Sequence, residues 1–148
     1  MRFYIRKCSR NEWAKFKRYH YLSSKLPSCL DGCFGLYAES GQIVGFIAVA
    51  KDFFRANSYN HYVISRLVIL PDYQGVGLGT RFIEFVARRC REENKLISIV
   101  TSAKNLIFAL KKKQWAKLVR FSAMNPKNDP KVKRRSVPTA TFKFDFKD

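Results

Sequence analysis

Several features that would assign this 148-residue chain to a familiar class are missing. Its four cysteines form no C-x-x-C pair, so the spacing favours neither a zinc site nor a disulfide framework, and we expect reduced thiols that mostly lie in the core. No apolar run reaches the length of a membrane span, and the first residues, MRFYIRK, lack the apolar core of a signal peptide. We therefore expect a cytoplasmic chain without a bound metal and without a membrane partner.

Acidic residues are also scarce. Eleven Asp and Glu stand against 29 Lys and Arg, which gives a formal net charge of +18. The excess is largest over residues 104–148, where thirteen basic side chains face three acidic ones. Such a surface attracts polyanions, so DNA, RNA or a ribosome comes into consideration as a partner. No fold-specific nucleic-acid motif is visible, and the same charge would serve solubility or the capture of a phosphorylated cofactor.

The apolar residues that are present follow regular periods. A hydrophobic content of 47% without repeats or linkers predicts a single domain over residues 1–148. Alternating patterns predict strands, with a hairpin turn at Ser40-Gly41, over residues 1–7, 33–40, 42–54, 61–70, 95–102 and 139–146. Helical spacing predicts a first helix capped by Asn11 and further helices over 78–93 and 103–115, whereas residues 124–138 are expected to form a loop. The apolar side of the second helix is expected to carry Leu78, Phe82, Phe85 and Val86.

The stretch LPDYQGVGLGTRFIEF, residues 70–85, has glycine at every second position between a strand and a helix. Gly75, Gly77 and Gly79 present backbone N–H groups that no side chain covers, and the helix amino terminus adds partial positive charge. The pattern therefore predicts a cradle for a phosphate or pyrophosphate. A P-loop is excluded because Gly-Thr-Arg follows where Gly-Lys-Ser/Thr is needed, and a dinucleotide fingerprint fails because Thr80 replaces its third small residue.

This stretch resembles the pyrophosphate loop of the GCN5-related N-acetyltransferases, whose signature is Gln/Arg-x-x-Gly-x-Gly/Ala. Residues 74–79, QGVGLG, fit it without a gap, and the order of elements along the whole chain is similar to that family. The resemblance implies a mixed α/β (α+β) fold with a central twisted, mostly antiparallel sheet, a splayed parallel strand pair and flanking helices. It also implies an acetyl-CoA-dependent N-acetyltransferase that transfers the acetyl group directly to an amine.

The resemblance assigns cofactor contacts to three places in this sequence. The loop would bind the pyrophosphate of coenzyme A, and main-chain groups of the preceding strand would pair with the pantetheine arm, while Asn105 is either a cofactor contact or a helix cap. The residues so implied are Leu67, Val68, Ile69, Gln74, Gly75, Val76, Gly77, Leu78, Gly79, Thr80 and Asn105.

Two parts of the family's usual proton route are absent. Many members carry a Tyr seven residues beyond the asparagine, where this chain has Lys112, and no Tyr occurs after residue 73. Many also carry a Glu on the central strand, but residues 62–70 contain no carboxylate. These departures leave the general acid and base open.

Replacements must come from elsewhere in the chain. The segment RYHYLSS supplies His20, which titrates near neutral pH, and Tyr21 beside it, although both would equally suit a helix end packed on the sheet. Asp52, at the end of a hairpin strand, could orient a base or the acceptor amine, or form a salt bridge. His61 is a weaker candidate, and either Ser65 or Arg66 should face the cleft because side chains alternate along a strand.

The acceptor is less defined than the cofactor. Basic charge favours a macromolecule or a nucleic-acid-linked amine, guided by lysines and arginines at 111–113 and 131–135. A second, weaker resemblance, to Mom-type phage DNA modification proteins, is carried by HYLS at 20–23 and implies base modification or nucleic-acid binding on the same fold. A small-amine acceptor is the third alternative. The sequence leaves the oligomeric state open, a dimer included.

Overall fold

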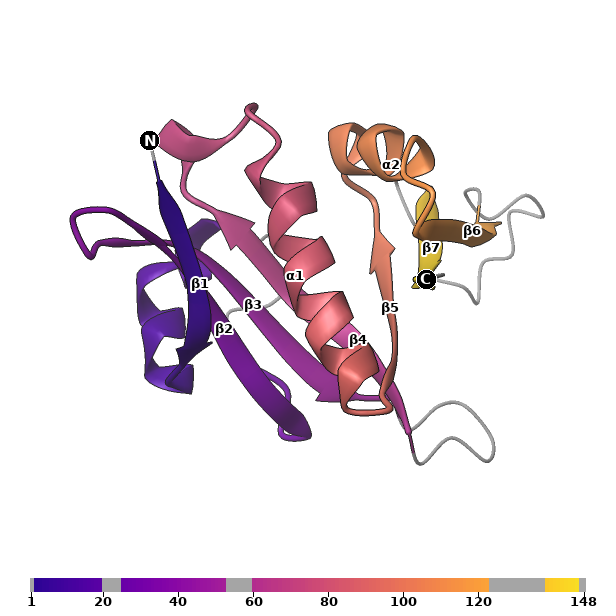
Figure 1. Cartoon of the computed structure of the whole chain (residues 1–148), viewed down its shortest axis with the longest axis horizontal. Coiled ribbons are helices and arrows are strands. Elements are labelled where there is room, and N and C mark those ends of the chain that lie inside the picture. Colours follow the sequence, from indigo (N-terminus) through magenta and orange to yellow (C-terminus); the bar gives the residue numbers. More distant parts are fainter. Residues whose placement is uncertain (1, 20–24, 53–59, 123–137, 147–148) are drawn as a thin grey trace, which may run out of the picture. The chain divides into compact units, whose positions relative to one another are not determined.

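The computed structural model describes residues 2–19, 25–52, 60–122 and 138–146. The chain divides into two compact units, Met1–Ile97 and Ser98–Asp148 (Figure 1). Within the described ranges no helix is both long and apolar enough to cross a bilayer. We describe each unit by itself, and the assignment of one domain to residues 1–148 stays a prediction.

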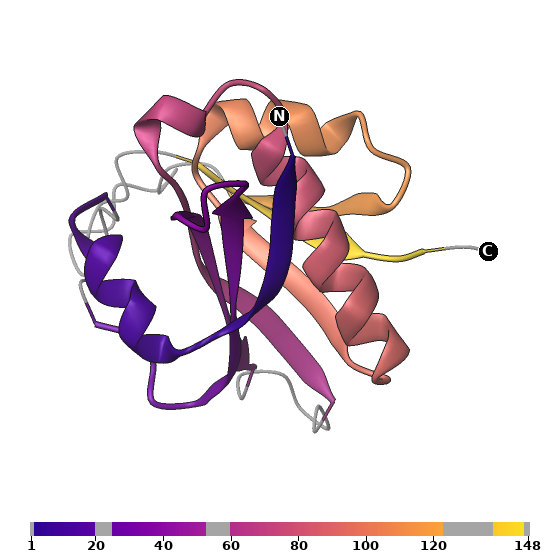
Figure 2. The same ribbon diagram turned by 60° about the vertical axis from the view of Figure 1, so that its left-hand side comes forward.

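Unit 1 is a four-stranded antiparallel meander with helices on its faces. Its strands and helices are, in chain order, β1 (Phe3–Cys8), η1 (Arg10–Lys15), η2 (Lys17–Tyr19), β2 (Leu30–Ala38), β3 (Ile43–Lys51), β4 (His61–Ile69), η3 (Pro71–Tyr73) and α1 (Leu78–Glu92). Each strand pairs with the next one in antiparallel register. The predicted hairpin is confirmed, because Gly41 turns the chain with φ +89° and Ala38 N–H donates to Gln42 O at 2.9 Å. In Figure 2 the 3₁₀ helices cover one face of this sheet and α1 covers the other.

The strand β5 (Leu96–Thr101) begins in unit 1, directly after α1. Its first residue lies beside the start of β4, since Leu96 N–H donates to Asn60 O at 2.9 Å. The unit β4–α1–β5 is therefore a crossover between neighbouring parallel strands. Beyond Ile97 the strand belongs to unit 2, so the expected splaying of the pair stays a prediction.

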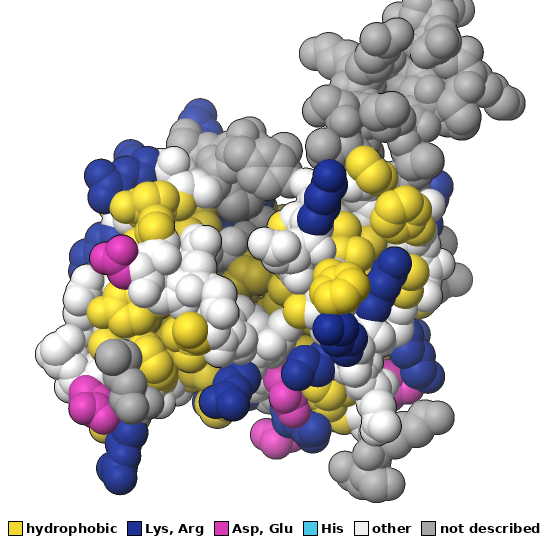
Figure 3. Space-filling model, turned by 90° about the horizontal axis from the view of Figure 1, so that it is seen from above, with side chains coloured by type: hydrophobic (Ala, Val, Ile, Leu, Met, Phe, Trp, Pro, Cys, Tyr) yellow, Lys and Arg dark blue, Asp and Glu magenta, His cyan; other side chains and the backbone are white. Residues whose placement is uncertain are grey.

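Unit 2 contains the rest of β5, α2 (Lys104–Lys111), β6 (Ala116–Ser122) and β7 (Thr139–Phe144). Its strands have the order β5-β7-β6 and both pairs are antiparallel. The inward side chains of β7, Phe142 and Phe144, are fully buried, as the strict alternation predicted. In the right-hand part of Figure 3, apolar side chains on the surface of this unit lie beside Lys and Arg side chains.

The mixed α+β fold with mostly antiparallel strands is confirmed, but three local predictions are wrong. The first helix is two 3₁₀ segments, and its cap is Ser9, whose Oγ accepts from Asn11 N–H at 3.1 Å, so Asn11 is the donor and not the cap. Phe85 is 40% exposed because the buried stripe of α1 runs through Phe82 and Val86. The strand β6 was not predicted at all.

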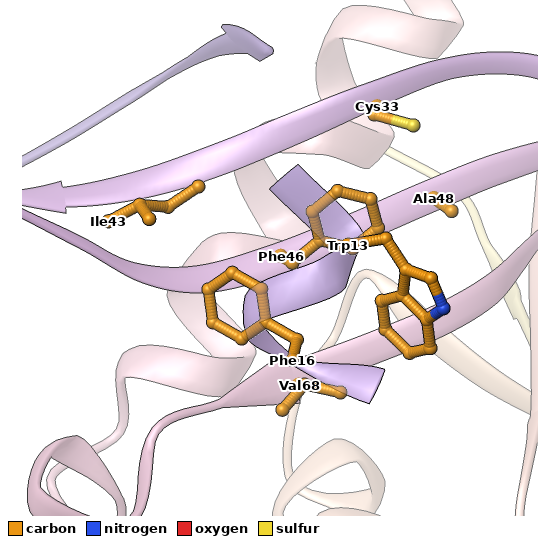
Figure 4. Packing of buried hydrophobic residues seen from close by; sticks show 7 residues of the cluster. All are labelled: Trp13, Phe16, Cys33, Ile43, Phe46, Ala48 and Val68. Carbon is orange, nitrogen blue, oxygen red and sulfur yellow. The ribbon is translucent and has the colours of Figure 1, made fainter. Parts of the chain in front are cut away.

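Two aromatic residues of this first segment belong to the core. Trp13 and Phe16, three residues apart, are both buried and lie against Phe46 of β3, at ring-centroid distances of 5.4 and 5.8 Å (Figure 4). Ala48 and Val68 complete the same cluster. This packing fixes β3 against the N-terminal segment, and β3 in turn holds β4 in register.

Candidate functional site

The glycine-rich turn begins where β4 leaves the sheet. Leu70 N–H still donates to Val44 O at 2.8 Å, and the short helix η3 then turns the chain away from β3. Gln74 closes this turn, because its side-chain Nε2 donates to Ile69 O at 2.7 Å. The Gln74 side chain therefore holds the turn to the end of β4, which explains a glutamine at this position without a direct ligand contact.

The helix α1 begins with an amino terminus that no side chain caps. Its N-cap is Gly77, with φ +82°, and no acidic residue lies in the first turn. The carbonyl of Gly77 accepts from Arg81 N–H at 3.3 Å, so the N–H groups of the three residues between them have no acceptor within the helix. Three convergent N–H donors at the positive end of a helix dipole form a binding site for an anion.

The glycines keep this end of the helix open. A Cβ built at Gly75, Gly77 or Gly79 would meet no atom within 4 Å, so internal packing explains none of them. Positive φ accounts for glycine at 75 and 77, where φ is +84° and +82°, but not at 79. At Gly79 the remaining reason for a missing side chain is space for something outside the protein.

The neighbouring side chains support the backbone of the turn. Thr80 is 8% exposed, and its Oγ1 donates to Gly77 O at 3.1 Å. Leu78 is buried in the core, whereas Val76 points into solvent with 71% of its surface exposed. Leu78 and Thr80, being buried, can thus meet a ligand only through their main chains, and the turn as a whole fits a diphosphate.

Main-chain direction along β4 separates the three residues expected to contact a pantetheine arm. Since Leu70 N–H points to β3, the groups of Val68, two residues earlier and opposite Phe46, also point to β3. Those of Leu67 and Ile69 point to the opposite edge. On that edge Gln74 Nε2 occupies Ile69 O, and the pairing of a pantetheine arm with Leu67 and Ile69 stays a prediction.

A β-bulge interrupts β4 at Ser65. Ala48 pairs with Arg66 and Val49 with Ile64, which leaves Ser65 as the extra residue. Its hydroxyl donates to Ala48 O at 3.2 Å. A bulge takes backbone groups out of the ladder, so β4 has a main-chain irregularity four residues before the end of the strand that sequence periodicity did not reveal.

Arg66 braces this bulge. Its two terminal nitrogens donate to Ser65 O at 2.6 Å and to Lys25 O at 2.7 Å, while its buried Nε has no partner among the described residues. Burial lowers the pKa of this guanidinium below its ordinary value. Both side chains form hydrogen bonds at this one bulge, and which of Ser65 and Arg66 faces the cleft stays a prediction.

The other predicted residues lie elsewhere or outside the described ranges. His20 and Tyr21 fall in residues 20–24, which the structure does not describe. Asp52 N–H donates to His61 O at 2.9 Å, which puts both residues at the far end of β4, roughly 27 Å from Ile69 at about 3.4 Å per residue. Asn105 is the second residue of α2, whose N-cap is Ala103, so its interpretation as a cap is wrong and the cofactor contact stays a prediction.

All four cysteines are free thiols, two of them buried and two half-buried. Burial raises the pKa of Cys8 to about 12 and that of Cys90 to about 11, and it also raises the pKa of Cys33. A thiol in this state is a poor nucleophile at neutral pH. None of these three cysteines is therefore suited to carry a covalent intermediate.

Comparison with known proteins identifies the family to which this fold belongs. Residues 3–107 match the profile of the Acetyltransferase (GNAT) family. The chain belongs to this family. A sequence comparison with curated proteins gives no significant match.

Solved structures of GNAT proteins share the fold at low sequence identity. The ribosomal-protein-S18-alanine N-acetyltransferase of Escherichia coli has a TM-score of 0.69 and 12% identity over 99% of this chain and 97% of its own. The ribosomal-protein-alanine N-acetyltransferase of Brucella melitensis has 0.70 and 12%, over 97% and 99%. A Bacillus anthracis protein described as a candidate streptothricin acetyltransferase, in complex with acetyl coenzyme A, has 0.66 and 15%, over 99% and 100%.

As a GNAT protein, the chain is an acetyl-CoA-dependent N-acetyltransferase. When bound, acetyl-CoA supplies an acetyl thioester that an amine can attack. The open, uncapped start of α1 fits the diphosphate of this cofactor, because Gly79 leaves room that a side chain would fill.

Proposed function

We propose that this GNAT enzyme acetylates an amine carried by a macromolecule or linked to a nucleic acid. The observation that carries the cofactor half of the proposal is the glycine-capped start of α1, with three N–H donors and no acidic side chain. The acceptor half is supported by the net charge of +18, which favours an anionic carrier. Structural neighbours named for ribosomal-protein alanine and for streptothricin indicate that this fold serves large and small acceptors alike.

In this proposal the main chain of unit 1 holds the donor. The N–H groups of Leu78, Gly79 and Thr80 bind the pyrophosphate, and Leu67 and Ile69 pair with the pantetheine arm as an added strand would. The bulge at Ser65, braced by Arg66, frees a backbone N–H to stabilise the oxyanion that forms on the acetyl carbonyl. These contacts orient the thioester, and the amine attacks it directly.

The amine must lose a proton, and the leaving thiolate gains stability from one. Lys112 occupies the position of the family's usual Tyr, and its Nζ lies 4.2 Å from the centroid of the Phe108 ring. We assign the base to His20, with Tyr21 beside it. Replacing His20 by alanine should lower kcat much more than it changes acetyl-CoA affinity, and full activity in that variant would refute the assignment.

The acceptor is tested by measuring coenzyme A release and product mass with three amines: an aminoacyl-tRNA, a peptide with a free amino terminus, and a polyamine. We expect turnover of a polymer-linked amine with a kcat/KM that falls steeply as salt rises, because phosphate contacts release counterions. Neutralising Lys131, Lys133, Arg134 and Arg135 together should raise the acceptor KM and leave acetyl-CoA binding unchanged. An unchanged KM would refute the guiding role of this cluster.

Two alternatives give different results in the same assay. A small-amine acetyltransferase would turn over the polyamine with a salt-insensitive kcat/KM and bind no polymer. A Mom-type or purely nucleic-acid-binding protein would retain DNA or RNA but release no coenzyme A with any amine, and His20–Ser23, which carry that resemblance, lie outside the described residues.

A further inference from the structure

Unit 2 exposes two phenylalanine rings that border one pocket. Phe108 of α2 is 63% exposed and Phe121 of β6 is 52% exposed, although side chains of this type are usually buried. Both line a pocket of about 250 Å³, together with Ile107 and Pro138. This volume lies below the 300–1,000 Å³ of drug-sized ligand sites, so the pocket suits a single flat group.

Lysines surround these rings. Lys104 and Lys111 line the pocket with them, Lys111 Nζ lies 5.8 Å from the centroid of Phe121, and Lys112 Nζ lies 4.2 Å from that of Phe108. We call these five residues the aromatic-lysine surface. Its rings and cations lie along the whole of α2, from its first residue to its C-cap, and on the strand β6.

The three lysines have no carboxylate partner in the part of the chain that the structure describes. Lys104 is also the first residue of α2, where the positive end of the helix dipole disfavours a cation. Helix stability therefore does not explain its position. Lysines without a carboxylate partner can bind phosphates, and exposed rings can stack on flat bases, so this surface suits a ligand that contains both.

An exposed phenylalanine on α1 has a different environment. Phe85 lies beside Arg88 and Arg89, but Glu92 and Glu93 line the same hollow, and Arg88 is paired with Glu84 at 3.1 Å. Positive charge there is largely compensated. The aromatic-lysine surface lacks this compensation, and residues 104–148 carry a net charge of +10 in sequence.

We propose that the aromatic-lysine surface binds single-stranded nucleic acid. An unpaired base stacks on Phe108 and Phe121 in the pocket, and the adjacent phosphates contact Lys104, Lys111 and Lys112. Stacking tolerates any base because each has a flat π face, so the surface selects unpaired strands over duplex and not one sequence over another. This surface would hold a nucleic-acid-linked acceptor, and its biological purpose therefore rests on the proposed function.

The test is fluorescence anisotropy of a labelled 12-nucleotide single-stranded RNA and of the matching duplex, with nuclease-treated full-length protein. The parent should bind the single strand more tightly than the duplex. Phe108→Ala and Phe121→Ala should each weaken single-strand binding roughly five- to 150-fold, as stacking losses on alanine substitution predict. Lys111→Ala should reduce the salt slope by about 0.7, the value for one phosphate on a single strand.

Matched controls separate this surface from general charge and from the cofactor site. Phe85→Ala removes another exposed ring, 40% accessible, and Lys117→Ala removes a lysine that is paired with Asp145. Neither should change RNA affinity by more than about twofold. Unchanged binding in both Phe108→Ala and Phe121→Ala would overturn the proposal, and so would equal losses in the Phe85→Ala control.

Acetyl-CoA titrations of the same variants distinguish the sources of failure. Unchanged acetyl-CoA affinity in Phe108→Ala and Phe121→Ala, together with lost RNA binding, supports the proposal. Lost acetyl-CoA affinity with RNA binding retained would overturn it by assigning the rings to the adenine of the cofactor. RNA binding at this surface without acetyl transfer to any nucleic-acid-linked amine would refute the proposed acceptor and leave the surface in place.

Discussion

Replacing Gly79 by glutamate should stabilise the folded protein and weaken cofactor binding at the same time. Gly79 is the second residue of α1, it has no positive φ, and a Cβ there meets no atom within 4 Å, so the backbone accepts a side chain without strain. Exchanging glycine for a good helix former gains about 0.5 kcal/mol, and a negative charge in the first turn adds about 0.3–1 kcal/mol. Together these give about 1 kcal/mol, or a rise of about 3 °C in the unfolding midpoint of a chain this size.

The same carboxylate would occupy the anion site. It competes for the N–H groups of residues 78–80 and repels the pyrophosphate, and two unit charges about 4 Å apart repel by about 1 kcal/mol in water and about 4 kcal/mol near a protein surface. The affinity for acetyl-CoA should therefore fall roughly a hundredfold, which corresponds to about 2.7 kcal/mol. Stability and binding would change in opposite directions, which a variant that merely unfolds cannot imitate.

The assay pairs thermal unfolding with isothermal titration of acetyl-CoA for the parent, Gly79→Glu and Gly79→Gln. Glutamine adds the same bulk without the charge, so its affinity should lie between those of the other two proteins. A stable Gly79→Glu variant that binds acetyl-CoA as tightly as the parent would refute the placement of the pyrophosphate. A fall of several degrees in its unfolding midpoint would refute the description of the open helix start.

Three further predictions follow from single residues. Arg66→Lys keeps the positive charge but loses the two hydrogen bonds that the guanidinium donates at the bulge. In steady-state kinetics kcat should fall at least tenfold while the affinity for acetyl-CoA is kept. An unaltered kcat would exclude the bracing role of Arg66. Burial raises the pKa of Cys8 to about 12 and that of Cys90 to about 11, so their thiolate fractions at pH 8 are on the order of 10⁻⁴ and 10⁻³. Both thiols should therefore resist a thiol reagent at pH 8 until the protein unfolds. Rapid labelling of either in the folded state would contradict their burial. Burial alone would lower the pKa of Lys95, but its contacts with Asp31 and a neighbouring glutamate raise this pKa overall. The contribution of Lys95 to the unfolding free energy should therefore persist below about pH 10.5 and be lost as the pH rises through the folded-state pKa. Urea unfolding of Lys95→Met at several pH values should lack this loss.

The backbone of the glycine-rich turn could be predicted from sequence because its conformation depends on neighbouring residues alone. Local residue types indicate each of its features: the positive φ at Gly75 and Gly77, the uncapped helix start and the end of the strand before Pro71. The hairpin at Gly41 was predictable for the same reason. Such features depend on a few consecutive residues, and their residue types report the backbone directly.

Features that depend on partners far away in the sequence were missed. The strand β6 pairs with β7, and a register shift between Leu118 and Arg120 breaks the alternation of apolar and polar residues by which a strand is predicted from sequence. The bulge at Ser65 is defined only by its pairing with β3, and the direction of the Val68 main chain follows from the same register. At the first helix the cap is Ser9 and not Asn11, because β1 ends at Cys8 and the helix begins at Arg10.

The most direct measurement is an isothermal titration of acetyl-CoA into the nuclease-treated parent, a Gly77→Glu variant and a Gly41→Glu variant. Both glycines have positive φ and open space around them, so the two substitutions impose the same backbone strain, but only Gly77 lies at the start of α1. We expect micromolar binding to the parent and to Gly41→Glu, and none to Gly77→Glu. Binding of equal strength to both variants, or no binding to the parent, would contradict the assignment of this helix start to the cofactor.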